Sequence, residues 1–101
     1  MERIVWTHEA QTWLQDIHDY IASDNPQAAQ KVIAGIVQKV QRLSSYPESG
    51  SYYRTEAEGD IRILLYGHYR IAYLLTPARE IIVLGVFHGS LDINRYIQGL
   101  D

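Results

Sequence analysis

Arg62, Arg70 and His88, all in the second half of the chain, are of the types that act on phosphate groups. A guanidinium donates paired hydrogen bonds to phosphate or carboxylate oxygens, and an imidazole exchanges a proton near neutral pH. Three tyrosines are interleaved with these residues: Tyr66, Tyr69 and Tyr73. On a sheet, such side chains could bind RNA or stabilise a phosphate during its cleavage. The alternative is structural, because solvated strand faces carry polar residues and tyrosine is a good strand former.

A site shared by Arg62 and Arg70 depends on the loop between them, at Gly67 and His68. A two-residue hairpin loop would place the two arginines on opposite faces of the sheet. A three-residue loop with a bulge would bring them to the same face. The sequence alone leaves both possibilities open.

Other kinds of site are not indicated. The chain has no cysteine, which removes thiolate nucleophiles and cysteine-ligated zinc, and it lacks the GxGxxG, P-loop, GxSxG and HExxH motifs. His8 and His18 would not meet on one helical face at the spacing of metal ligands, so we expect no metal site and no cofactor. The formal net charge of −3 counts against a protein that grips nucleic acid mainly through phosphate contacts.

Two amphipathic helices are predicted after a short strand at Arg3–Trp6. Thr7 is a good N-cap for the first helix, and Asn25 followed by Pro26 is a typical start for the second. Apolar residues recur at spacings of three and four in both helices. In the first they are Ala10, Trp13, Leu14, Ile17, Tyr20 and Ile21, and in the second Ala29, Val32, Ile33, Ile36, Val37, Val40 and Leu43. The short connection predicts an antiparallel helix hairpin.

Three β-rich runs follow an irregular connection at Ser44–Gly59, and short turns separate them. The runs are Ile61–Tyr66, Tyr69–Leu75 and Glu80–Phe87, and helical spacing returns over Leu91–Leu100. The predicted fold class is α+β, with the helix hairpin packed on a mainly antiparallel four-stranded sheet and a short C-terminal helix. Ile61–Tyr66 and Ile81–Val86 are apolar at almost every position, which indicates burial on both faces of the sheet. We expect the final helix or a partner chain to cover the face opposite the hairpin.

The length of 101 residues fits one domain, residues 1–101. No stretch approaches the ~20 continuous apolar residues of a membrane span, so no membrane partner is expected. The N-terminus lacks the basic and apolar segments of a secretory signal. We therefore expect a soluble cytoplasmic protein.

Five motifs occur in the order found in the RelE/ParE toxin superfamily, which the chain resembles over nearly its whole length. They are V-W-T-x-E-A, L-x-x-I-x-x-Y-I-A-x-D-N-P-x-A-A, L-x-x-x-P-x-x-G, R-x-L-x-x-G-x-Y-R-I-A-Y and V-x-H-G. The resemblance implies a small α+β toxin that is neutralised by a cognate antitoxin encoded by an adjacent gene. RelE-like members cut messenger RNA on the ribosome, whereas ParE-like members poison DNA gyrase and are not known as nucleases.

By position, Arg70 matches an arginine that RelE-like nucleases use on the RNA phosphate. Gly89 stands where those nucleases often have arginine, their basic cluster is missing, and Tyr96 lies about one residue from the expected aromatic position. The His-Gly-x-x-Asp ending at His88 is more like that of ParE-type members. His88 could still be a general base, or it could cap or hydrogen-bond the turn before the last helix.

The resemblance therefore favours a ParE-like toxin without a reaction of its own, which inhibits growth by binding a target, DNA gyrase. On this interpretation Tyr66, Tyr69 and Tyr96 are candidates for binding the antitoxin or the target. One alternative is a RelE-like endoribonuclease that acts on the ribosome and messenger RNA with Arg62, Arg70 and His88 as catalytic residues. Another is a degenerate toxin that keeps only the binding of its antitoxin.

Overall fold

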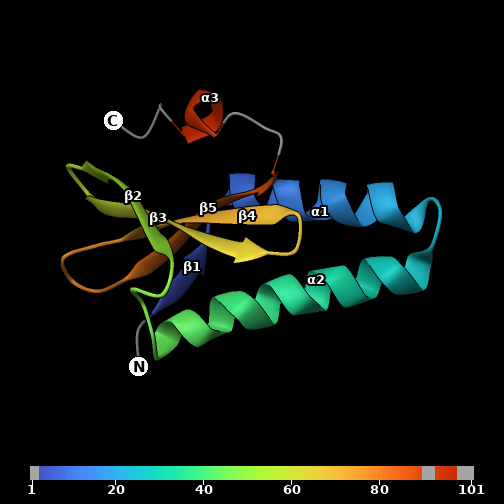
Figure 1. Ribbon diagram of the computed structural model, residues 1–101, viewed down its shortest axis with the longest axis horizontal. Helices are drawn as coiled ribbons and strands as arrows, with labels where there is room; N and C mark the ends of the chain where they lie inside the picture. Colours follow the sequence, from blue (N-terminus) through green and yellow to red (C-terminus); the bar gives the residue numbers. More distant parts are fainter. Residues whose placement is uncertain (1–2, 90–92, 98–101) are drawn as a thin grey trace.

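A helix hairpin packs on a five-stranded sheet in the computed structural model, which describes residues 3–89 and 93–97 (Figure 1). The two long helices are α1 (His8–Ala22) and α2 (Pro26–Gln41), and a 3-10 turn, η1 (Arg42–Ser44), follows α2. The remaining elements are β1 (Ile4–Trp6), β2 (Ser51–Glu56), β3 (Gly59–Tyr66), β4 (Tyr69–Leu75), β5 (Ile81–His88) and α3 (Asn94–Ile97). The α+β class is as predicted.

Both predicted N-caps are confirmed. The Thr7 hydroxyl accepts a hydrogen bond from the Ala10 backbone N–H at 3.0 Å, and the Asn25 side chain accepts one from the Ala28 N–H at 3.1 Å. Pro26 occupies the first turn of α2, where its missing N–H leaves no hydrogen bond unmade. These local signals set where α1 and α2 begin, and the turn between them folds the helices into the predicted hairpin (Figure 1).

The sheet has one strand more than predicted. The order is β1-β5-β4-β3-β2, with β1 parallel to β5 and every other pair antiparallel. The extra strand is β2, which lies inside the segment predicted to be irregular. Turn signals flank it closely on both sides, and it becomes a strand by pairing with β3, across a bulge between Tyr52 and Arg54.

The face of the sheet toward the hairpin carries the larger core. Side chains from all three middle strands pack there against α1 and α2, and Ile36, Val40, Ile71 and Val86 are fully buried among them. The alternation of strand side chains assigns the odd residues of β4, from Tyr69 to Leu75, to this face.

The opposite face carries a second, smaller core that includes Phe87 and the buried Ile93 beside α3. Trp13 of α1 contacts the Phe87 ring edge-on at a centroid distance of 4.8 Å, and Tyr96 of α3 lies 5.1 Å from Trp13 and 5.6 Å from Phe87. The final helix thus covers part of this face, one of the two covers expected, although 63% of Leu65 stays exposed. Residues 91–92 and 98–100 of the predicted helix lie outside the described residues.

Among the described residues, no helix has the length and apolarity that crossing a membrane requires.

Candidate functional site

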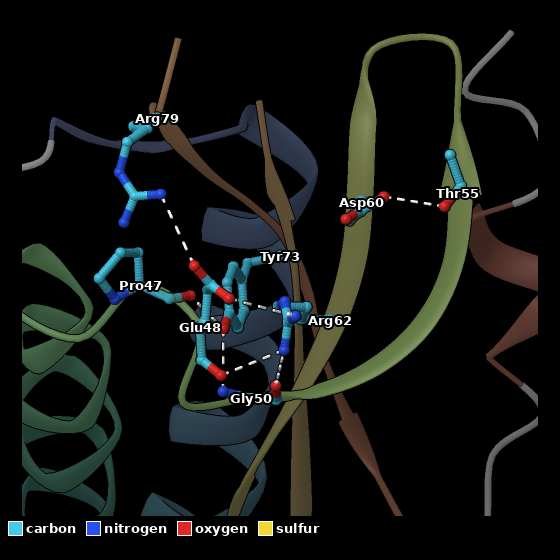
Figure 2. A network of polar contacts seen from close by, with 8 residues as sticks. All are labelled: Pro47, Glu48, Gly50, Thr55, Asp60, Arg62, Tyr73 and Arg79. Atoms are coloured by element: carbon cyan, nitrogen blue, oxygen red, sulfur yellow. Dashed lines mark hydrogen bonds and ion pairs between the residues drawn. The ribbon is translucent and has the colours of Figure 1, made fainter. Parts of the chain in front are cut away.

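Arg62 is engaged with the loop that leads into β2 (Figure 2). Its guanidinium donates to the backbone oxygens of Glu48 at 3.1 Å and Gly50 at 2.6 Å, and it lies 3.9 Å from the Glu48 carboxylate. Only 17% of the Arg62 side chain is exposed. The guanidinium is therefore directed into the protein, where it fixes a loop, while its buried Nε makes no hydrogen bond to the described residues.

Tyr73 of β4 also binds this loop. Its phenol donates to the Pro47 carbonyl at 2.7 Å and accepts from the Gly50 N–H at 3.0 Å, and its side chain is fully buried. Burial raises the pKa of this phenol, while the hydrogen bond from Gly50 and the charge of Arg62 act in the opposite direction. The Tyr73 phenol and the Arg62 guanidinium thus bind backbone groups of Pro47, Glu48 and Gly50 in one loop (Figure 2).

Glu48 lies between two cations. Its carboxylate is 3.7 Å from Arg79 and 3.9 Å from Arg62, on the wall of a polar cavity of about 320 Å³ that Asp60 also lines. Two positive and two negative side chains share this cavity, so their charges balance there. The sequence analysis missed Glu48 and Arg79, because only the folded loop brings them beside Arg62.

The register of β3 and β4 places Arg62 and Arg70 on opposite faces of the sheet. The loop has two residues, with Tyr66 paired to Tyr69, and Gly67 takes a φ of +56° that glycine adopts without strain. A site that Arg62 and Arg70 share on one face would have required the three-residue loop.

Arg70 and His88 lie at the same end of the sheet, on opposite faces. Arg70 pairs with Phe87 on the face opposite the hairpin, and its guanidinium donates to the Gly89 carbonyl at 3.2 Å. His88 pairs with Tyr69 on the hairpin side, four residues along β4 from the partner of Arg62. Four strand residues span about 13 Å, so Arg62 is remote from this end.

His68, in the β3–β4 loop, was not singled out from the sequence. Its ring lies nearly parallel to that of His88, with centroids 6.4 Å apart, and Tyr69 meets His88 edge-on at 6.0 Å. The backbone N–H of Gly89 donates to the His68 carbonyl at 2.7 Å, which joins the end of β5 to the loop. Both imidazoles are exposed.

The three tyrosines proposed for binding differ in their surroundings. Tyr66 and Tyr69 are half-buried against the larger core, and Tyr66 rests on α2 at Gly35, where a Cβ would overlap its phenol. Tyr96 is 48% exposed and packs edge-on against Trp13. Among these three, Tyr96 presents the most surface to a partner.

A groove at the C-terminal end of α2 was also missed. It has a volume of about 470 Å³ and is lined by Lys39, Arg42, Tyr46, Ser49 and Leu64. A sequence signal for it exists, since residues 25–47 contain three basic residues and no acidic one.

No three histidine, cysteine, aspartate or glutamate side chains gather into a metal-binding group within residues 3–89 and 93–97.

A family model and a curated relative each match most of the chain. The family model described as the ParE toxin of the type II toxin–antitoxin system parDE matches residues 4–93. The candidate toxin Y4kP of Sinorhizobium fredii is 36% identical over 87 residues, which cover 86% of this chain and 88% of that protein.

Two solved structures share the fold. A chain from the chromosomal ParDE toxin–antitoxin system of P. aeruginosa superposes with a TM-score of 0.69 and 25% identity, covering 87% of this chain and 96% of that one. A chain from the toxin–antitoxin complex RelBE2 of Mycobacterium tuberculosis gives a TM-score of 0.62 and 22% identity, covering 86% and 96%. The second likeness is one of fold alone.

Proposed function

Because the chain belongs to the ParE toxin family of type II toxin–antitoxin systems, we propose that it inhibits growth by poisoning DNA gyrase and is neutralised by an antitoxin from an adjacent gene. The matched residues include both long helices and all five strands. Both solved relatives are described as parts of toxin–antitoxin systems, which supports an antitoxin as the partner of this chain as well. The toxin acts by binding and performs no reaction of its own.

The position of Arg62 is the observation that favours gyrase over RNA as the target. A nuclease needs its cationic and proton-transferring groups around one phosphate, within hydrogen-bond reach of it. Arg62 instead binds two backbone carbonyls of its own loop, about 13 Å along the sheet from the level of His88. Gly89, where related nucleases often have arginine, adds no charge. This arrangement supports a toxin that does not cleave RNA.

The RelE-like alternative has one observation in its favour. Arg70 reaches the backbone of Gly89, directly after His88, so a cation and an exposed imidazole lie at the same end of the sheet. The two side chains leave opposite faces of the sheet, so an RNA phosphate would have to lie at the end of the strands to contact both. Cleavage would then depend on Arg70 and His88, without Arg62.

Pulse-labelling of DNA and protein synthesis, just after induction of the chain without its neighbouring gene, separates the two functions. We expect DNA synthesis to fail first, and purified protein to inhibit supercoiling by gyrase. If protein synthesis fails first and messenger RNA is cut in the presence of ribosomes, the gyrase proposal is wrong. Rescue of growth by the adjacent gene tests the antitoxin.

Two variants strengthen the test, Arg70→Ala and His88→Phe, each checked for folding by circular dichroism. A gyrase poison should keep its toxicity in both variants. Loss of toxicity in both, with the fold intact, would favour the nuclease. Lys31→Glu serves as a control for expression. Lys31 is exposed on α2 and is distant in the sequence from both residues.

A further inference from the structure

The charges of the two long helices are opposite in sign. Residues 4–24 carry four acidic side chains and no lysine or arginine, whereas residues 25–47 carry Lys31, Lys39 and Arg42 and no acidic side chain. The protein as a whole has a net charge of −3, so α2 and η1 form a local exception. An anionic partner that approaches this protein is therefore attracted to the α2 side.

Two of the three cations line the groove of about 470 Å³ at the end of α2, which we call the basic groove. Lys39 and Arg42 are three positions apart, which places them on the same side of the helix end. Leu64 of β3, with only 7% of its surface exposed, contributes apolar wall, and Tyr46 stands beside it with 70% exposed. The basic groove thus combines positive charge with an apolar, aromatic wall.

Stability of the helix explains part of this arrangement. Cations in the last turn complement the negative end of the helix dipole, and Lys39 and Arg42 occupy that position. The dipole gives no reason for an aromatic ring to stand largely in water beside an apolar wall. Exposed tyrosines next to a concave, partly apolar surface are typical of protein-binding sites.

We propose that the basic groove binds an acidic segment of the antitoxin that carries one apolar side chain, an inference that rests on the proposed function. Carboxylates of the segment contact Lys39 and Arg42, and its apolar side chain packs between Tyr46 and Leu64. A polypeptide fits better than a nucleic acid, because two cations beside an aliphatic wall neutralise few phosphates, and the protein as a whole carries a net charge of −3.

The test measures binding of the purified antitoxin from the adjacent gene to the full chain by titration calorimetry. Arg42→Glu and Tyr46→Ala change exposed side chains of the basic groove, and Lys31→Glu is the matched control, an exposed cation of α2 outside it. We expect Arg42→Glu to weaken binding by about tenfold at low salt, and the control to change it less than about twofold. Circular dichroism and thermal unfolding confirm that each variant is folded.

Each outcome has one meaning. If the antitoxin does not bind the unaltered chain, the proposed function fails before the groove is tested. If it binds, and Arg42→Glu and Tyr46→Ala behave as Lys31→Glu does, the basic groove is not its site. If a single-stranded RNA oligonucleotide binds and only its affinity falls in Arg42→Glu, the groove serves nucleic acid and the proposal is overturned.

Discussion

The phenol oxygen of Tyr73 lies 3.0 Å from the backbone nitrogen of Gly50, so a strand in the core fixes a loop residue 23 positions earlier in the chain. The same oxygen donates to the Pro47 carbonyl. We expect Tyr73→Phe to lower the free energy of unfolding by about 2 kcal/mol, because it leaves buried backbone groups without partners. Urea unfolding measures the loss. Tyr20→Phe, at a tyrosine that is 82% exposed, should change stability by less than about 0.5 kcal/mol.

The same tyrosine predicts a loss of stability at alkaline pH. An unfolded tyrosine ionises with a pKa of about 10. Burial raises the pKa of Tyr73, so the unfolded chain releases this proton before the folded protein does. The contribution of Tyr73 to stability is therefore complete below about pH 10 and is lost as the pH rises through its folded pKa. Unfolding at about pH 8 and about pH 11 should show a larger decline for the unaltered chain than for Tyr73→Phe.

The close approach of Tyr66 to Gly35 predicts that Gly35→Ala has opposite effects on stability with and without the Tyr66 side chain. Replacing a glycine inside a helix by alanine normally stabilises a protein by about 1 kcal/mol. In α2, however, a Cβ at Gly35 would overlap the Tyr66 phenol, so Gly35→Ala should destabilise by about 1–3 kcal/mol. In a Tyr66→Ala background the overlap is gone, and the same change should stabilise. Equal effects in the two backgrounds would show that the residues do not interact.

Thr7 and Asn25 are caps of unequal importance. Both accept a hydrogen bond at a helix N-terminus, but the Thr7 hydroxyl also donates to the Val83 carbonyl of β5 at 2.9 Å. We expect Asn25→Ala to cost about 1 kcal/mol and Thr7→Ala about 2 kcal/mol. Thr7→Ser keeps the hydroxyl and should recover most of the loss. Thermal unfolding of the three variants provides the measurement, and equal losses for the two alanine variants would contradict it.

Local signals were sufficient to predict the helices and four of the five strands. The caps at Thr7 and Asn25 act on backbone groups within three residues, so sequence alone reveals them. The strand at Ser51–Glu56 was missed because its pairing with β3, and not its own composition, makes it a strand. Its absence from the prediction is why the sheet was expected to have four strands.

The candidate site was less predictable because its properties depend on tertiary contacts. Nothing near Arg62 in the sequence indicates that it binds the carbonyls of Glu48 and Gly50, more than ten residues away. The face on which Arg70 lies depends on the length of the loop at Gly67. The sequence was compatible with either two or three loop residues, and the fold has two. The sequence shows which residue types are present, whereas the partners of those residues required the fold.

The parallel pairing of β1 with β5 has a consequence for how the protein is made. Thr7 bonds to Val83, 76 residues later, and Ile4 aligns with Ile81. At the usual pace of synthesis, about 5–20 residues per second, the first strand waits roughly 4–15 s for the strand that it joins. During that time Trp13 lacks its contact with Phe87, so the first helix emerges from the ribosome before the strand on which it packs. A cell that makes this protein thus has several seconds, in every round of translation, before the finished fold exists.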